Sequence, residues 1–217
     1  MKLTNNVVSI LKNFSGINQS IVVKAGSNLQ TISNMKDVFA KVEIEEKFPA
    51  DFAIYDLGEF LGVVNLFEDP NLEFGKKSVV ISEGSARQEY FYAEPSNVTQ
   101  PPENGVTLPS VEVKARLSRQ QLGQLLKAAS TNGSTDLTFK NGDVKVHDRS
   151  IPNSNSFTIE GVADHEEDYS LSIRVESLRL IADDYDIEIC AKGLARLAGA
   201  SGVEYFVALQ PDGTYGS

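Results

Sequence analysis

Residues 51–69 read DFAIYDLGEFLGVVNLFED, and the spacing of the apolar residues changes halfway along this stretch. Up to Asp56 the side chains alternate in character, which is typical of a strand. Beyond Asp56 the apolar residues follow the three-and-four spacing of an amphipathic helix: Leu57, Phe60, Leu61 and Val64. The stretch therefore predicts a strand joined directly to a helix. It contains no histidine, cysteine or basic residue, so we expect it to act as scaffold.

The same helical spacing occurs at two other places in the chain. The apolar positions are Val7, Ile10, Leu11 and Phe14 in one, and Leu122, Leu125, Leu126 and Ala129 in the other. The segments VVSILKNF and LGQLLKAA align without a gap, including the lysine after the apolar pair. A shorter fourth candidate, VESLRLIA at residues 175–182, lies at the corresponding place late in the second half. We therefore predict four helices, two in each half.

Between these helices the chain consists of short segments rich in β-branched and aromatic residues, which predicts strands. The segments are QSIVVKAG, VFAKVEIEE, KSVVIS, QEYFYAE, DLTFKNGDVKVHD, SFTIEGV, YSLSIRV, YDIEICA and VEYFVALQ. Asn141-Gly142 is a strong signal for a β-hairpin. The expected fold class is α+β, with two similar domains that each combine an antiparallel sheet with two helices.

A linker separates the two halves. Residues 94–110, EPSNVTQPPENGVTLPS, contain four prolines, which cannot continue a helix or a central strand. Residues 1–108 hold nine basic and fourteen acidic residues, and residues 109–217 hold eleven and sixteen, so both halves carry −5. Equal charge is expected of two copies of one design. We expect an N-terminal domain over 1–95, a connector over 96–110 and a C-terminal domain over 111–217.

Catalytic chemistry has few candidates in this sequence. His147 falls on a strand of the expected hairpin, and His165 lies in the acidic turn ADHEED, which lacks the spacing of a metal site. Cys190, the sole cysteine, sits in the alternating strand YDIEIC and is expected to be buried. No nucleophile elbow, phosphate loop or dinucleotide motif is present. We expect no enzyme activity, no metal and no cofactor.

The distribution of basic residues is more informative than the net charge of −10. Residues 114–127, KARLSRQQLGQLLK, contain four basic residues and no acidic one. At 100° per residue, Lys12 lies about 140° from Val7, and Lys127 lies about 140° from Leu122. Both lysines therefore oppose their apolar stripes. In an acidic protein this pattern indicates one surface that is kept free of negative charge, although ordinary solvated helix faces would give the same pattern.

Several stretches together resemble one family, the DNA polymerase sliding clamps (processivity factors) of T-even-like bacteriophages. They are MKLTNNVVSILKNFSGIN, FAIYDLGEFLGVVNLF, QQLGQLLKAA, VESLRLIADDYDIEICAKG and EYFVALQPDGT, which are spread over nearly the whole chain. The resemblance implies a homotrimeric ring around duplex DNA, with two similar domains per subunit and helices lining the hole. Four expected helices in each of three subunits would give the twelve helices of such a ring. The helix of residues 51–69 would then face the channel.

The resemblance also implies residues that face DNA, which are Lys12, Arg119, Lys127 and Arg179. Lys127 and Arg179 fall where the family pattern also has a basic residue. The helix after Asp56 departs from this pattern, because Glu59 lies in its first turn and Gly62 stands where the other helices have lysine. An evenly basic lining is therefore not expected.

The resemblance further implies partners. Clamps of this family hold the phage DNA polymerase through a short peptide, and an ATP-dependent clamp loader opens and closes the ring. The matching positions for an apolar peptide pocket are Val106, Leu108, Pro109, Val207, Leu209 and Pro211. Residue patterns alone favour Val207 and Leu209 as core strand residues, and Pro109 and Pro211 as residues that shape the linker and the tail. The implied location is the cytoplasm of the infected bacterial host, and a membrane partner is not expected.

Two other function classes remain open at the level of sequence. One is a phage structural or adaptor oligomer that does not encircle DNA. The other is a hydrolase built on paired carboxylates, for which the sequence nominates no residue. The mass of the assembled oligomer and its retention on circular DNA distinguish the clamp from the adaptor.

Overall fold

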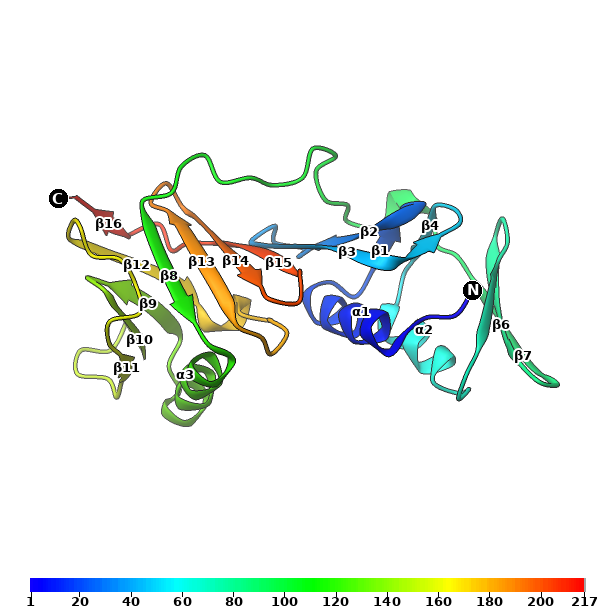
Figure 1. Ribbon diagram of the computed structural model, residues 1–217, viewed down its shortest axis with the longest axis horizontal. Helices are drawn as coiled ribbons and strands as arrows, with labels where there is room; N and C mark the ends of the chain where they lie inside the picture. Colours follow the sequence, from blue (N-terminus) through cyan, green and yellow to red (C-terminus); the bar gives the residue numbers. More distant parts are fainter. Residues whose placement is uncertain (217) are drawn as a thin grey trace. The chain divides into compact units, whose positions relative to one another are not determined.

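The strand and the helix expected within residues 51–69 both form in the computed structural model, which describes residues 1–216 (Figure 1). β4 (Phe52–Ile54) is buried along its whole length and is followed by α2 (Leu57–Val64). Asp56 caps this helix, because its Oδ1 atom accepts a hydrogen bond from the backbone N–H of Glu59 at 2.9 Å. The prediction for this stretch is confirmed.

The chain divides into two units, Met1–Asn104 and Gly105–Ser217. The division falls within residues 96–110, where a connector was expected. A 3-10 turn, Pro95–Asn97, lies at the start of this segment.

The first unit combines two helices with small antiparallel sheets. α1 (Asn5–Ile17) and α2 pack against each other through their apolar stripes. β1 (Ile21–Val23) pairs with β4, and β2 (Gly26–Ile32) pairs with β3 (Val38–Phe48). β5 (Asn71–Phe74), β6 (Ser78–Glu83) and β7 (Ala86–Phe91) form a three-stranded sheet in that order. Figure 1 shows α1 along one face of the β2–β3 pair.

The second unit contains two antiparallel layers and one helix. One layer has the order β15-β14-β13-β8, and the other has the order β11-β10-β9-β12-β16. The first comprises β8 (Val113–Leu117), β13 (Tyr185–Cys190), β14 (Leu194–Gly199) and β15 (Glu204–Ala208). The second comprises β9 (Asp136–Lys140), β10 (Asp143–His147), β11 (Phe157–Ile159), β12 (Tyr169–Arg174) and β16 (Thr214–Tyr215). α3 (Arg119–Asn132) packs against β8, β10 and β11.

The hairpin signal at Asn141-Gly142 is confirmed. β9 and β10 pair in register around it, with Lys140 opposite Asp143. Asn141 and Gly142 both have positive φ angles, 47° and 95°, as a two-residue hairpin turn of the mirror-image type requires.

The prediction of a fourth helix, at residues 175–182, is wrong. Residues 175–182 form only a 3-10 turn at Val175–Ser177, and the chain then runs without helical structure to β13. The hydroxyl of Tyr185 donates to the carbonyl oxygen of Ile181 at 2.6 Å, and the N–H of Ile181 donates to the hydroxyl of Tyr205 at 3.2 Å. Because Tyr205 takes the N–H of Ile181, which a helix would direct to the carbonyl oxygen of Ser177, tertiary contacts override the local helical spacing.

Five strands were not predicted from the sequence patterns: β2, β5, β8, β14 and β16. β14 is rich in Leu, Ala and Gly, which have low or moderate strand preference, and it forms because β13 and β15 pair with both of its edges. Arg196 in β14 is held between Glu188 and Glu204 at 2.8 and 2.7 Å. The pairing partners of β14, rather than its own composition, determine its conformation.

Candidate functional site

Lys12 lies on the outer face of α1. The helix begins after Thr4, whose Oγ1 atom accepts a hydrogen bond from the N–H of Val7 at 3.3 Å. Its buried stripe is Val7, Ile10, Leu11, Phe14 and Ile17. Lys12 is exposed, so its ammonium group is available to a partner in solution.

Lys127 occupies the equivalent place on α3. A reciprocal cap between Ser118 and Gln121 starts this helix, and Gly133 with φ +66° ends it. The buried residues are Leu122, Leu125 and Ala129, with Leu126 half-buried beside them. Lys127 is exposed on the opposite face. The sequence-based orientation of both lysines therefore agrees with the structure.

Arg119 is the first residue of α3 and is exposed. Its backbone N–H donates to Asp184 Oδ1 at 2.6 Å, so a carboxylate of the chain itself already sits at this helix end. A phosphate approaching Arg119 would meet this carboxylate as well as the guanidinium group.

Arg179 does not lie on a helix, because the fourth expected helix is absent from the described residues. It is an exposed residue of the segment after the 3-10 turn, where its Nε–H donates to the carbonyl oxygen of Glu176 at 3.3 Å. The placement of this residue on a helix was therefore wrong, while its role toward DNA stays a prediction.

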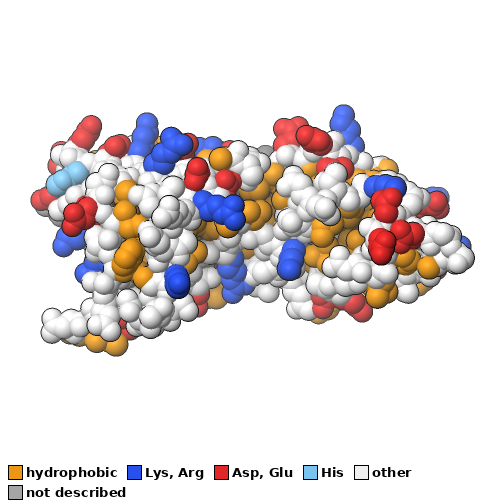
Figure 2. Space-filling model, turned by 60° about the horizontal axis from the view of Figure 1, so that its bottom comes forward, with side chains coloured by type: hydrophobic (Ala, Val, Ile, Leu, Met, Phe, Trp, Pro, Cys, Tyr) orange, Lys and Arg blue, Asp and Glu red, His pale blue; other side chains and the backbone are white. Residues whose placement is uncertain are grey.

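The basic run at residues 114–127 is also divided. Lys114 and Arg116 belong to β8, and only Arg119 and Lys127 belong to α3. Arg116 is paired with Asp186 at 3.6 Å. The run is therefore not one continuous helical surface. In the view of Figure 2, basic side chains are scattered over the surface, several of them beside acidic ones, and they form no continuous basic stripe.

The outer face of α2 carries no basic residue. Gly58, Glu59 and Gly62 are exposed there. Glu59 Oε2 accepts a hydrogen bond from the hydroxyl of Tyr90 at 3.1 Å. Burial, followed by the neighbouring Glu59 carboxylate, raises the pKa of Tyr90 to about 12. This neutral to acidic face of α2 agrees with the expectation that the helices do not all present basic residues.

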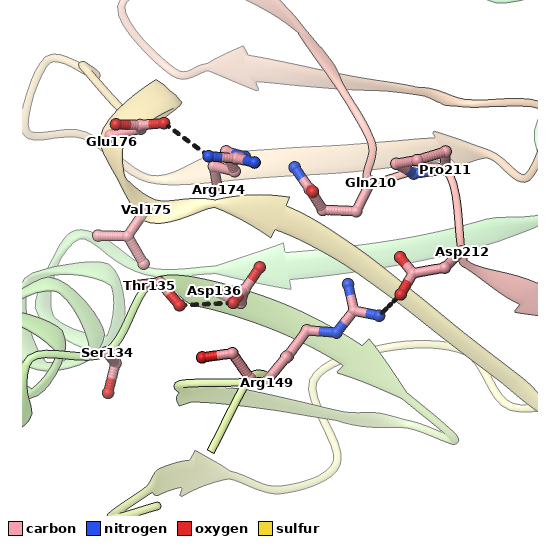
Figure 3. A pocket seen from close by; sticks show the side chains of 11 residues that line it. Ser134, Thr135, Asp136, Arg149, Arg174, Val175, Glu176, Gln210, Pro211 and Asp212 are labelled. Carbon is pink, nitrogen blue, oxygen red and sulfur yellow. Dashed lines mark hydrogen bonds and ion pairs between the residues drawn. The ribbon is translucent and has the colours of Figure 1, made fainter.

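The six residues assigned to a partner-peptide pocket differ widely in exposure. Val207 is fully buried and Leu209 is 8% exposed, so both side chains contribute to the core of the second unit. Val106 and Leu108 are half-buried, and Pro109 and Pro211 are exposed. Of the six, only Pro211 lines the cavity drawn in Figure 3, which has a volume of about 790 Å³. The pocket assignment stays a prediction.

The cavity beside Pro211 is polar, and no sequence pattern predicts it. Its walls include Asp136, Arg149, Arg174 and Gln210, which come from four separate segments of the second unit. Arg149 forms an ion pair with Asp212 and holds the pKa of that carboxyl below its usual value. Neither arginine stands in a recognisable motif, so only the folded chain reveals that they lie together.

The remaining candidates for chemistry have structural surroundings. Cys190 is fully buried in β13, as expected, with its Sγ atom 3.2 Å from the hydroxyl of Ser110. His147 is half-buried rather than a plain surface residue, and its Nε2 atom lies 3.0 Å from Thr138 Oγ1. His165 is exposed in its acidic turn. Over residues 1–216 the structure contains no cluster of three or more potential metal ligands and no helix suited to crossing a bilayer.

Comparison with solved structures defines the class of fold. The A. fulgidus PCNA bound to the C-terminal region of FEN-1 is 12% identical, with a TM-score of 0.70, and the match covers 95% of this chain and 96% of that one. The Helicobacter pylori beta clamp is 14% identical, with a TM-score of 0.69, over 98% of this chain and 66% of that one. The two-unit antiparallel architecture is therefore the fold of DNA clamps.

Comparison of sequences identifies the family. Residues 4–98 match the family model described as DNA polymerase processivity factor. The sliding clamp of Vibrio phage KVP40 is 33% identical over 221 residues, which cover 97% of this chain and 99% of that protein. The chain belongs to the family of phage DNA polymerase sliding clamps, as the sequence resemblance indicated. The structural or adaptor alternative is not favoured by these relationships.

Proposed function

We propose that three copies of this chain form a head-to-tail ring that encircles duplex DNA and tethers the phage DNA polymerase during replication. Membership of the sliding-clamp family supports the DNA and polymerase partners. The observation that carries the DNA-facing assignment is the position of Lys12 and Lys127, which are exposed on equivalent helices directly opposite the buried stripes.

Ring closure requires two different surfaces that fit each other, because a head-to-tail interface is heterologous. β7 and β11 each lie at the end of a sheet, and no described strand of this chain pairs with their outer edges. By contrast, the edge of β8 is covered, since Arg116 N–H donates to Val162 O at 2.9 Å and Asp164 N–H donates to Lys114 O at 2.8 Å. We propose that β7 of one copy pairs with β11 of the next.

The side chains beside these two edges suit burial in an interface. Phe91 in β7 is 66% exposed, and Ile151 in the loop before β11 is 55% exposed. Pairing the two edges would satisfy open main-chain groups and cover this apolar surface. The three-fold count itself rests on the family resemblance.

Weak attraction to DNA is the physical requirement of a ring that slides. A few basic side chains per copy, namely Lys12, Arg119, Lys127 and Arg179, would give a salt-dependent attraction to phosphates without reading base edges. The acidic remainder of the chain, with a net charge of −10, would repel DNA from other surfaces. Loading would then depend on an opened ring.

The partners follow from the same function. We propose that the phage polymerase supplies a peptide to the region of Val106, Leu108, Pro109, Val207, Leu209 and Pro211. A separate ATP-dependent clamp loader would supply the energy for opening, so the chain itself would need no enzyme activity. The site of action would be the cytoplasm of the infected host.

Two measurements on the purified full chain test the ring. Light scattering behind a size-exclusion column should give about 71 kDa, three times the chain mass of 23.7 kDa, with lower values on dilution. The loaded protein should remain on nicked circular DNA and leave quickly when one cut makes the DNA linear. A stable monomer or dimer, or equal loss from circular and linear DNA, would refute the trimeric ring.

A further inference from the structure

The polar cavity beside Pro211 is bounded by segments that are distant in sequence. The start of β9, the loop after β10, the end of β12 and the segment before β16 all line it. The Arg149–Asp212 ion pair joins the loop after β10 to the segment before β16. With a volume of about 790 Å³, the cavity is large enough for several residues of a peptide.

The charges of the cavity are nearly balanced. Arg149 is paired with Asp212, and Arg174 is paired with Glu176 at 3.2 Å. Asp136 adds a third carboxylate to the lining. A phosphate or another anion would meet three carboxylates, and a cationic side chain would meet two guanidinium groups. Neither kind of ligand is favoured by this arrangement.

The groups at the centre of the cavity both donate and accept hydrogen bonds. Asp136 is 8% exposed, and its Oδ2 atom accepts from the hydroxyl of Thr135 at 2.7 Å. Figure 3 shows its carboxylate pointing into the space between Arg174, Gln210 and Arg149. A guanidinium group has five N–H donors, so an arginine that makes one ion pair keeps others for a ligand. Donors and an acceptor therefore converge on one volume.

A peptide main chain has the complementary character, because each unit is neutral and carries one donor and one acceptor. Its carbonyl oxygen fits the donors of Arg174 and Gln210, and its N–H fits the carboxylate of Asp136. Pro211 and Val175 add apolar contact at the walls. We propose that this cavity binds an extended segment of a partner protein through the main-chain amides of that segment.

This inference rests on the proposed tethering of a polymerase, and it changes the expected footprint of the partner. The apolar residues assigned from the family resemblance supply one part of the site. The polar cavity supplies a second part, which adjoins Pro211 and fixes the direction of the bound segment. Arg174, Gln210 and Asp136 are then the residues that determine which segments bind.

The experiment measures fluorescence anisotropy of a labelled synthetic peptide that copies the C-terminal segment of the polymerase of the same phage. The intact clamp is titrated against it, and polymerase stimulation is measured in parallel. Arg174→Gln and Gln210→Ala should each weaken peptide binding about tenfold, as expected for one lost hydrogen bond to a charged or amide group. Arg116→Gln is the matched control, because Arg116 is also exposed and paired with a carboxylate, yet lies outside this cavity.

A second comparison separates main-chain recognition from recognition of an anion. The peptide with a free terminal carboxylate and the same peptide with a terminal amide should bind within about twofold of each other. If amidation abolishes binding, or if inorganic phosphate competes with the peptide, the cavity is an anion site and the proposal is wrong.

The outcomes also distinguish this inference from the proposed function. Unchanged peptide affinity in both cavity variants would overturn the inference and leave the tethering intact. The inference would also be overturned, with the tethering left intact, if the wild-type clamp stimulates the polymerase without binding the peptide. If the wild-type clamp does not stimulate the polymerase at all, both proposals fail. Thermal unfolding of each variant identifies any loss that comes from misfolding.

Discussion

The hydroxyl of Tyr185 donates a 2.6 Å hydrogen bond to the carbonyl oxygen of Ile181, and this bond holds in place a segment that its sequence alone favours as a helix. Tyr185 is 1% exposed, and burial raises the pKa of its hydroxyl. Tyr205 binds the N–H of the same residue from the other side. The two tyrosine hydroxyls thus hold both main-chain groups of Ile181.

Tyr185→Phe should lower the free energy of unfolding by about 1 to 3 kcal/mol, because the carbonyl of Ile181 loses its partner while the ring still fills its place. Urea unfolding followed by circular dichroism measures the change. Tyr55→Phe is the control, since Tyr55 is 65% exposed, and it should change stability by less than about 0.5 kcal/mol. Equal effects in the two variants would contradict the role given to the Tyr185 hydroxyl.

The sequence predicted the elements whose own residues determine them. The helix stripes, the Asn141-Gly142 turn and the exposed positions of Lys12 and Lys127 all follow from local spacing, and all are present. Prediction from the sequence failed where contacts with distant segments of the chain determine the conformation, as in β14 and in residues 175–182. The cavity beside Pro211 is even less predictable from the sequence. Its residues come from four segments, and no spacing within one segment brings them together.

Gly123 is exposed within α3, and a Cβ atom added there would meet nothing within 4 Å. Gly123→Ala should therefore raise the free energy of unfolding by about 1 kcal/mol, since alanine loses less backbone entropy in a helix. Gly133→Ala in the cap of the same helix is the control, and it should destabilise because the φ angle of Gly133 is +66°. A stabilising effect at both positions would contradict this account of the cap.

The double variant Lys12→Glu with Lys127→Glu should leave the trimer mass of about 71 kDa unchanged, three times 23.7 kDa, and weaken retention on circular DNA. Both side chains are exposed and opposite their buried stripes, so folding should not depend on their charge. Each lost phosphate contact should reduce the dependence of log affinity on log salt by roughly 0.9.

The matched control for this pair is Lys47→Glu with Lys140→Glu, two exposed lysines of β3 and β9. These substitutions make the same change in net charge, one in each unit. Normal retention in the Lys12 and Lys127 variant, or equal loss in the control, would remove the DNA-facing assignment.

Leu108→Ala should reduce polymerase stimulation several-fold more than it reduces retention on DNA. Leu108 is half-buried in the segment between the first unit and β8, where the family resemblance implies a partner pocket. Val111→Ala, at a residue 41% exposed nearby, is the control and should affect neither measurement. Equal losses of stimulation and retention in Leu108→Ala would indicate misfolding rather than a lost partner contact.

His147 gives the second unit a pH dependence. Burial, followed by nearby positive charge from Lys145, lowers the pKa of its imidazole from the ordinary value of 6.5. Because the folded-state pKa is the lower one, the unfolded chain takes up this proton first. The contribution of neutral His147 to the free energy of unfolding is complete above about pH 6.5. It is lost as the pH falls through the folded-state pKa.

His147→Gln should therefore flatten the fall in unfolding free energy between about pH 7 and pH 5. Denaturant titrations at a series of pH values measure this slope. His165→Gln is the comparison, because that imidazole is exposed in the acidic turn. If the wild-type slope persists in His147→Gln, other groups cause the pH dependence.

Cys190 offers a practical way to follow the molecule. It is the sole thiol among 217 residues, and it is fully buried at the end of β13 with Ser110 beside its sulfur. A thiol reagent can reach it only when the second unit opens. The rate of thiol modification therefore measures how often the second unit opens, and the protein needs no added label. The same shielding means that a cysteine introduced at β7 or β11 would react alone, and a fluorophore placed there could report the moment at which one subunit separates from the next.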